Sequence, residues 1–338
     1  MQELMQEQKD HPFSTQLVNL ASSKLGGLVV YATDEFFASK DRLIKDEDPI
    51  FITDKYDDHG KWMDGWESRR RRDGGYDYSI IKLATSGIIQ GVDINTAHFT
   101  GNHPPYASLE AMLSDDFQDK SAKWVEILPK TKIKANSHNF FKIKSKDNFS
   151  FIRLNIFPDG GVARLRTYGR PNWNETNNHS KELVELTSIL NGGYVVGYND
   201  AHYGNPWVIL APGRGENMGD GWETRRRREP GNDWIIVSLA KRGKIEQIEI
   251  DTAYFKGNYP DRCTVEYADI KDVSDTKLLK DKVGWKELLG EKKLEMDCVH
   301  NFYQEDLTHQ GPATHLRLSI YPDGGISRFR AFGSVVDG

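Results

Sequence analysis

A tandem internal repeat dominates this 338-residue sequence. The pattern Asp-Gly-Trp-Glu-(Ser/Thr)-Arg-Arg-Arg-Arg occurs at 64–72 and again at 220–228. The stretches 64–104 and 220–260 align without a gap, and about half of their positions are identical. A duplication of this length predicts two copies of one fold unit. Polar groups that both copies share, and that a core does not need, are therefore the first candidates for a functional site.

Shared motifs extend the repeat toward both ends of the chain. Gly-Gly-x-Val-Val lies near the start of each copy, at 26–30 and 192–196. Pro-Asp-Gly-Gly with two Arg residues beyond it closes each copy, at 158–166 and 322–330. Two units of roughly 150 residues match the usual size of a domain with its own core. We therefore predict a polar tail at 1–12, a first repeat at 13–171, a linker at 172–178 and a second repeat at 179–338.

Within each copy, short runs rich in β-branched and aromatic residues alternate with Gly, Pro and Asp, which is the pattern of strands and turns. In the first copy these runs cover 77–83, 88–99, 151–157 and 162–168. Pro158-Asp-Gly-Gly between the last two runs predicts a hairpin turn. Ser14 and Ser180 each predict the N-cap of a short helix. The pattern favours an all-β fold of two tandem β-sandwich domains with short capping helices.

The composition argues against several functional classes. A net charge of −5 and a pI near 6.1 give no overall attraction for nucleic acid or an anionic membrane. No apolar run approaches the roughly 20 residues that a membrane helix needs. The polar N-terminus resembles neither a signal nor a transit peptide, and Cys263 and Cys298 have no counterparts in the first copy. We expect a cytoplasmic protein without nucleic-acid or membrane partners.

Paired arginines recur at two places in each copy. The pairs are Arg69 with Arg71, Arg164 with Arg166, Arg225 with Arg227, and Arg328 with Arg330. On a strand, residues two apart point to the same face. A planar guanidinium can hold a carboxylate or a urea carbonyl through two hydrogen bonds, so each pair is a candidate for substrate binding. An ion-paired sheet face is the alternative for each pair.

Two glutamates and two histidines complete the shared candidates. Glu67 and Glu223 precede the Arg runs by two residues, and each is a candidate general acid or base. His138 and His300, each followed by Asn, form the only histidine position that both copies share, and each is a candidate catalytic residue. The alternatives stay open. The glutamates could serve as counter-ions for Arg, and the histidines could make structural hydrogen bonds.

A series of motifs follows a distinctive order in the first copy. Asp-Glu-Phe-Phe-Ala-Ser-Lys-Asp at 34–41, Phe-Thr-Gly-Asn at 99–102 and Leu-Asn-Ile-Phe-Pro-Asp-Gly-Gly-Val-Ala-Arg-Leu-Arg at 154–166 flank the Arg run and His-Asn-Phe-Phe. In this order the motifs resemble the allantoicase family over nearly the whole chain. The resemblance implies two jelly-roll sandwiches of the galactose-binding-like type, and hydrolysis of allantoate to ureidoglycolate and urea. It also adds the motif residues Asn102 and Asn258 as substrate-binding candidates.

The shared residues suit the reaction that the resemblance implies. Allantoate is a small carboxylate whose central carbon bears two ureido groups, so an enzyme must hold the carboxylate and protonate the departing urea. Arg suits the first task, and Glu or His suits the second. No metal-ligand cluster recurs in both copies, so we expect no metal site and no cofactor beyond a weakly bound activating divalent cation at most. We expect allantoate as the ligand and a homo-oligomeric assembly.

A non-catalytic jelly-roll module that binds a small anion or a sugar is the alternative function. A lectin-like site would favour exposed aromatic residues, whereas Arg, Glu and His dominate the shared set. The copies also differ at matched positions, since Phe36 faces His202 and His98 faces Tyr254. The sequence therefore leaves open whether one or two sites work.

Overall fold

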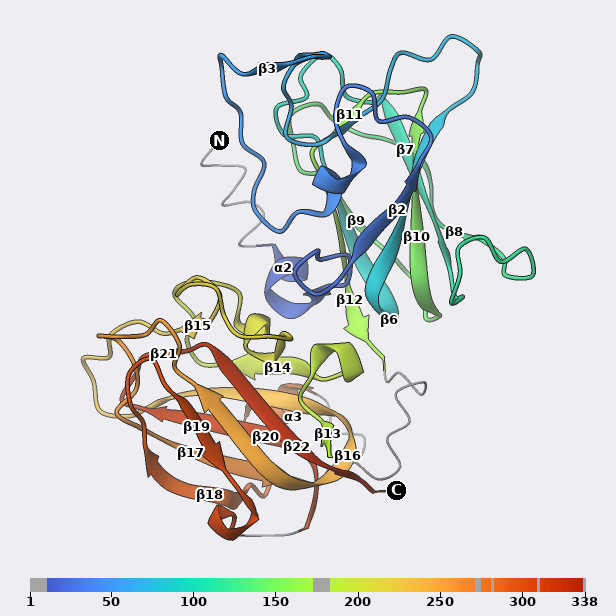
Figure 1. Ribbon diagram of the computed structural model, residues 1–338. Helices are drawn as coiled ribbons and strands as arrows, with labels where there is room; N and C mark the ends of the chain where they lie inside the picture. The colour runs from blue at the N-terminus through green and yellow to red at the C-terminus, as the bar shows by residue number, and fades with distance from the viewer. Residues whose placement is uncertain (1–10, 173–182, 271–274, 281–282, 309–310, 337–338) are drawn as a thin grey trace. The chain divides into compact units, whose positions relative to one another are not determined.

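The computed structural model describes residues 11–172, 183–270, 275–280, 283–308 and 311–336. The chain divides into two units, 1–170 and 171–338, which repeat the same order of antiparallel strands (Figure 1). The predicted linker at 172–178 lies outside the described residues apart from Asn172. The predicted N-terminal tail does so apart from His11 and Pro12.

The first unit consists of strands joined by turns and short helical segments. Its strands are β1 (Val18–Asn19), β2 (Leu28–Ala32), β3 (Tyr56–Asp57), β4 (Gly60–Lys61), β5 (Trp66–Glu67), β6 (Asp77–Asn95), β7 (Tyr106–Met112), β8 (Val125–Lys132), β9 (Phe140–Lys142), β10 (Asn148–Phe157), β11 (Gly161–Val162) and β12 (Arg164–Pro171). Its helical segments are α2 (Pro12–Gln16) and the 3-10 helix η1 (Lys40–Ile44).

The second unit repeats this arrangement. Its strands are β13 (Val184–Glu185), β14 (Tyr194–Tyr198), β15 (Trp222–Glu223), β16 (Asp233–Asp251), β17 (Arg262–Ala268), β18 (Lys286–Lys293), β19 (Val299–Phe302), β20 (Pro312–Tyr321), β21 (Gly325–Ile326) and β22 (Arg328–Val335). Its helical segments are η2 (Ile189–Asn191), η3 (Pro206–Leu210), α3 (Asp275–Leu279) and η4 (Gln304–Asp306). The all-β prediction with two tandem sandwich domains is confirmed.

One long strand belongs to both layers of each sandwich. In the second unit, residues 235–238 of β16 pair with β14, and residues 233–238 pair with β20. Residues 243–251 pair with β22, and the first two of them also pair with β20. The equivalent strand β6 pairs with β2 and β10 through its first half and with β9 near its end. The prediction of separate strands at 77–83 and 88–99 was therefore wrong, because alternating burial continues through the residues between them.

The Pro-Asp-Gly-Gly motif is not a hairpin turn, contrary to the prediction. It joins β10 to β11, but β10 pairs with β6 and β7 while β11 pairs with β5. Its glycines have two separate roles. Gly160 adopts a φ of 136°, and a Cβ atom on Gly161 would lie 2.0 Å from the ring of Phe99. The motif therefore packs against Phe99, the aromatic residue of the Phe-Thr-Gly-Asn motif.

The predicted helix cap at Ser14 was also wrong. Helix α2 begins after His11, whose Nδ1 accepts a hydrogen bond of 3.2 Å from the backbone of Phe13, and Ser14 lies within the helix. The chain then turns extended because Val18 and Asn19 pair with β12. Ser180, the matching prediction in the second copy, lies outside the described residues.

A buried tryptophan fixes the strand that carries each candidate glutamate. Trp66 and Trp222 are fully buried. The indole Nε1 of Trp66 donates to the carbonyl oxygen of Asp34 over 2.7 Å, and that of Trp222 donates to the carbonyl oxygen of Asp200 over 2.8 Å. Because β5 and β15 each contain two residues, this anchor holds the following glutamate in place.

Candidate active site

Glu67 is a buried carboxyl group with an amide partner. Pairing of β5 with β11 places its backbone opposite Gly161. Glu67 is 9 % exposed, and its Oε1 accepts a hydrogen bond of 2.6 Å from Nδ2 of Asn102. Burial raises the pKa of the Glu67 carboxyl above its usual value, and the hydrogen bond from Asn102 offsets only part of this effect. Such a carboxyl group is suited to proton transfer.

A cavity of about 620 Å³ opens over this pair, and its size is that of a small-molecule site. Its lining includes Phe37, Glu67, His98, Thr100, Asn102 and Asn136. The rest of the lining is Phe51, His59, Gly60, Lys61 and Met63, all from the connection formed by residues 45–63. Glu67 is the only acidic residue in this lining, and Lys61 is the only Lys or Arg.

The connection 45–63 is specific to the first unit. It links η1 to Asp64 and contains the short hairpin β3–β4. The corresponding connection of the second unit, residues 211–219 between η3 and Asp220, is ten residues shorter. The first cavity therefore has a wall for which the second unit has no equivalent stretch of chain.

Sequence reasoning missed three basic residues of the cavity: His59, Lys61 and His98. Nε2 of His98 lies 3.1 Å from the carbonyl oxygen of Pro49, and its ring stacks on Phe51 with centroids 5.7 Å apart. The second copy does not share them, so a comparison restricted to shared residues does not find them. The signal that could have found His59 and Lys61 is the unequal length of the two copies, since the longer connection 45–63 contributes to the cavity wall.

The glutamate–asparagine pair recurs in the second unit. Nδ2 of Asn258 donates a hydrogen bond to Oε1 of Glu223. In each unit, the structure thus brings the predicted asparagine into contact with the predicted glutamate of the same unit. Among the described residues, the first glutamate has no Arg ion pair, so its partner is an amide and the counter-ion alternative does not apply to Glu67.

Arg164 and Arg166 are structural groups of the first unit. The guanidinium of Arg164 is fully buried, and its Nη2 lies 2.8 Å from Oδ2 of Asp64. Burial alone would raise the pKa of Asp64, but the contact with Arg164 holds it below its usual value. Arg166 is 4 % exposed and donates to the carbonyl oxygens of Lys45 and Asp46. Neither Arg lines the cavity of Glu67, and their predicted role in binding substrate stays a prediction.

Arg328 and Arg330 have the same structural character in the second unit. Nη2 of Arg328 lies 2.9 Å from Oδ2 of Asp220, and Nη1 of Arg330 lies 2.6 Å from Oε1 of Glu249. Arg328 also donates to the carbonyl oxygens of Gly213 and Asp220. These arginines hold the connection 211–219 against the sheet, so the alternative of an ion-paired sheet face describes them.

The Arg run is an irregular segment and not a strand. The backbone N–H groups of Arg69 and Arg71 donate to the carboxylates of Asp34 and Asp159 over 2.8 and 2.7 Å, so they are unavailable for strand pairing. Nη2 of Arg69 lies 2.7 Å from Asp34, and Nη1 of Arg71 lies 2.7 Å from Asp77. The run lines a groove of about 610 Å³ that shares no lining residue with the cavity of Glu67.

The second Arg run repeats these contacts. Nη2 of Arg225 lies 3.0 Å from Asp200, and Nη1 of Arg227 lies 3.1 Å from Asp233. In both units the predicted substrate-binding arginines of the run are therefore engaged by aspartates of their own unit. Their role in binding substrate stays a prediction.

The two candidate histidines are not structurally equivalent. His138 is buried, and its Nδ1 lies 2.6 Å from Oδ2 of Asp93. His300 instead occupies the place of Asn139. Nε2 of His300 accepts from the backbone of Glu295 over 2.8 Å, and Nδ1 contacts the carbonyl oxygen of Ile250 at 3.0 Å.

Asn139 makes the two matching hydrogen bonds in the first unit. Its Oδ1 accepts from the backbone of Lys134, and its Nδ2 donates to the carbonyl oxygen of Ile94, each over 2.9 Å. The predicted pairing of His138 with His300 was wrong, because one position shifts between the copies. Neither histidine lines the cavity of Glu67.

Two further features bear on metals and membranes. Within the described ranges, no group of three or more His, Cys, Asp or Glu residues is arranged to hold a metal ion. No helix in the described part of the chain is long and apolar enough to cross a membrane. The predicted absence of a cofactor remains a prediction.

Fold and site together define a tandem-repeat β-sandwich protein with a buried carboxyl group in a small-molecule cavity, which is an arrangement typical of enzymes. The allantoicase repeat matches residues 18–172 and 184–336. The chain belongs to the allantoicase family, and it is an enzyme of that family.

Curated relatives and solved structures agree with this assignment. "Probable allantoicase 1" of Burkholderia mallei is 51 % identical over 324 residues, covering 96 % of each chain. "Probable allantoicase" of Rhizobium meliloti is 51 % identical over 328 residues, again covering 96 % of each chain. The crystal structure of allantoicase from Saccharomyces cerevisiae is 36 % identical with a TM-score of 0.78, covering 98 % of each chain.

Proposed function

We propose that this enzyme hydrolyses allantoate to ureidoglycolate and urea in the cavity of the first unit, with Glu67 as its acid–base group. Membership of the allantoicase family supports the reaction. The observation that carries the site is the buried carboxyl group of Glu67, bonded to Asn102 at the wall of a cavity of about 620 Å³. A cavity of this volume can enclose a small ureide.

The reaction requires proton transfer at two points. Water adds its oxygen to the central carbon of allantoate, the bond from that carbon to one ureido nitrogen breaks, and this nitrogen leaves in neutral urea. The departing nitrogen must gain a proton, and the attacking water must lose one. Glu67 can donate the first proton as a neutral acid and then recover a proton as a carboxylate. Its raised pKa makes the neutral form more accessible than that of an ordinary glutamate.

Asn102 has a positioning role in this proposal. Its Nδ2 donates to one oxygen of Glu67, so the other oxygen stays available for the reacting atoms. The hydrogen bond favours the carboxylate form and limits the rise of the pKa. Orientation and acidity of Glu67 therefore both depend on the Gly-Asn motif.

The decisive test is product formation by the purified protein. Incubation with allantoate should release urea, measured colorimetrically, together with ureidoglycolate, measured as the glyoxylate that it yields. Allantoin should remain unchanged, because its ring presents no free carboxylate. Absence of urea at several pH values, with and without added divalent metal, would contradict the proposal and favour a non-catalytic binding module. A homo-oligomer and a cytoplasmic location remain predictions.

A further inference from the structure

Lys61, in the wall of the cavity, has no carboxylate partner in the described part of the chain. Its Nζ donates to the carbonyl oxygens of Ile52, over 2.8 Å, and Thr53. The ammonium also lies 4.9 Å from the ring centroid of Phe51 and 4.8 Å from that of Tyr56. Among the described residues, no Asp or Glu forms an ion pair with it.

These contacts fix the ammonium group without neutralising its charge. Two of its three N–H donors are directed to carbonyl oxygens, so one donor remains for a further acceptor. The two aromatic rings favour a cation at this place. An anchored, uncompensated cation in a cavity is a binding group for a small anion.

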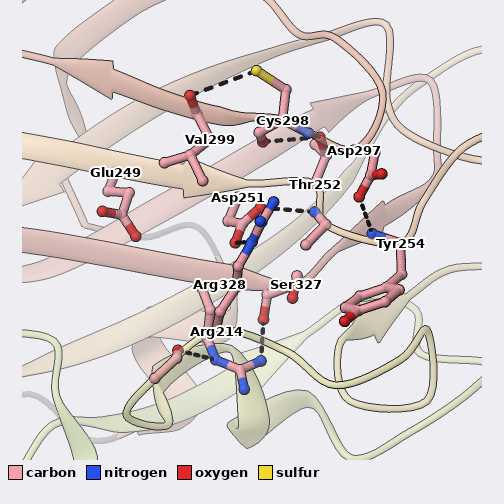
Figure 2. Close-up of polar contacts among 12 residues, drawn as sticks. Arg214, Glu249, Asp251, Thr252, Tyr254, Asp297, Cys298, Val299, Ser327 and Arg328 are labelled. Atoms are coloured by element: carbon pink, nitrogen blue, oxygen red, sulfur yellow. Dashed lines mark hydrogen bonds and ion pairs between the residues drawn. The ribbon is translucent and has the colours of Figure 1, made fainter.

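The second unit also differs at two lining positions outside the connection 45–63. Asp297 accepts a hydrogen bond of 2.8 Å from the backbone of Tyr254, as Asn136 does from that of His98. This matching contact places Tyr254 where the first cavity has His98, and Asp297 where it has Asn136 (Figure 2). The glutamate–asparagine pair is thus retained, but its neighbours are different.

Cations near the second pair are compensated by acids. Nζ of Lys256, which replaces a threonine of the first cavity, lies 3.7 Å from Oδ2 of Asp297. Nε of Arg214, from the short connection 211–219, lies 3.2 Å from Oδ2 of Asp251 (Figure 2). Neither cation is left with the uncompensated charge that Lys61 carries.

We propose that Lys61 binds the carboxylate of the substrate, and that the first unit alone holds a working site because only its connection 45–63 supplies this residue. The inference rests on the proposed function for the identity of the substrate. It replaces the arginines of the run with a lysine of the cavity as the carboxylate-binding group. It also gives the second glutamate–asparagine pair, Glu223 and Asn258, a structural role and not a catalytic one.

Substitution of Lys61 tests the binding role. Lys61→Met keeps the length of the side chain and removes its charge, so KM for allantoate should rise about 10- to 100-fold, with a smaller change in kcat. Lys61→Arg restores a cation and should recover much of the lost affinity. The matched control is Lys55→Met, because Lys55 lies on the same connection but stacks on Trp62, 3.9 Å from its ring centroid, outside the cavity lining.

A binding measurement separates this inference from the proposed reaction. Calorimetric titration of allantoate into the Glu67→Gln variant should show one molecule bound per chain. Adding Lys61→Met to that variant should weaken binding about 10-fold or more, whereas adding Lys55→Met should not. Circular dichroism checks that each variant is folded, and Lys61→Arg gives a second reading if Lys61→Met is not.

Each outcome decides one of the two proposals. Unchanged affinity in the Lys61 variants, or no binding by Glu67→Gln, overturns the role of Lys61. Two molecules bound per chain overturn the assignment of a single site. If the wild-type protein releases no urea, the proposed reaction fails, while the calorimetric comparison still tests Lys61.

Discussion

Asn102 donates a hydrogen bond of 2.6 Å to the carboxyl group of Glu67, although the two residues are 35 positions apart in the chain. The contact joins two motifs that both copies share, Asp-Gly-Trp-Glu and Gly-Asn. Asn258 and Glu223 make the same contact at the same separation. Two motifs that are distant in the chain therefore contribute to one hydrogen-bonded carboxyl group.

The acid–base role of Glu67 predicts a large loss of rate on removal of its titration. Glu67→Gln keeps the shape of the side chain and can still contact Asn102, so kcat should fall by about 100-fold or more. Steady-state urea release measures the effect. Glu223→Gln is the matched control and should retain nearly full activity. Equal losses in the two variants would instead show two working sites.

The hydrogen bond from Asn102 to Glu67 predicts that substitution of Asn102 displaces the pH profile of kcat/KM. The hydrogen bond from Asn102 counteracts the rise of the pKa of Glu67 that burial causes, so Asn102→Leu should move that pKa further above its ordinary value of 4.5. The limb of the kcat/KM profile that Glu67 controls should move to higher pH, and it should be absent from Glu67→Gln. Asn258→Leu is the control. If this limb does not move in Asn102→Leu, a group other than Glu67 controls it.

The burial of Glu185 predicts that the stability of the second unit depends on pH. Its Oε1 lies 3.4 Å from Arg330, but Arg330 is closer to Glu249, at 2.6 Å. Because Glu249 largely neutralises Arg330, burial dominates and raises the pKa of Glu185 to about 7. The folded state then binds the proton more tightly than the unfolded state, so this group reduces stability as pH rises from about 4.5 to about 7.

Glu185→Gln removes this dependence. Relative to wild type, its free energy of unfolding should increase between about pH 5 and about pH 8, by at most roughly 3 kcal/mol. Guanidinium chloride unfolding at the two pH values measures the change, with the exposed Glu229→Gln as control. A difference that is the same at both pH values would mean that Glu185 is already ionised in the folded protein at the lower one.

Arg164 predicts a loss of stability that is unrelated to substrate. Arg164→Met leaves the carboxylate of Asp64 buried without its nearest cation, and the free energy of unfolding should fall by about 3–5 kcal/mol. Arg70→Met is the control, because Arg70 is exposed, and it should change stability by less than about 0.5 kcal/mol. An unchanged midpoint, or a raised KM in the folded fraction, would return Arg164 to the substrate-binding candidates.

Metal content gives an independent expectation. No cluster of three ligands exists among the described residues, so elemental analysis should find less than one tightly held zinc ion per chain. Dialysis against a chelator should leave the thermal midpoint unchanged, although activity could still respond to a weakly bound cation. Stoichiometric zinc that resists dialysis would contradict this expectation.

Duplication was an effective guide to the site, but it did not discriminate between roles. Glu67 and Arg164 are equally shared between the copies, and the sequence offered both as site residues. The structure separates them by their partners, since the cavity contains the first and a buried ion pair contains the second. A polar residue can recur in both copies because the fold needs it or because the reaction needs it. Repetition alone therefore does not distinguish a structural role from a catalytic role.

Residue identity between the two copies was misleading at the histidine position. His138 and His300 align in sequence, but hydrogen bonds match His300 with Asn139. The side-chain amide and the imidazole can each accept from one backbone N–H and contact one carbonyl oxygen. The fold requires those two hydrogen bonds, and two residue types satisfy them, so identity of residue type did not indicate identity of position.

The sequence by itself determined the two-unit all-β organisation, the family and the motif residues Glu67 and Asn102. Strand periodicity and an internal duplication are local properties, and they can be read along the chain. Only the tertiary structure decided which polar residues meet, and that the connection 45–63 completes one cavity. Contacts between distant segments depend on strand register and on the path of loops, and one position of register exchanges partners without changing the local pattern.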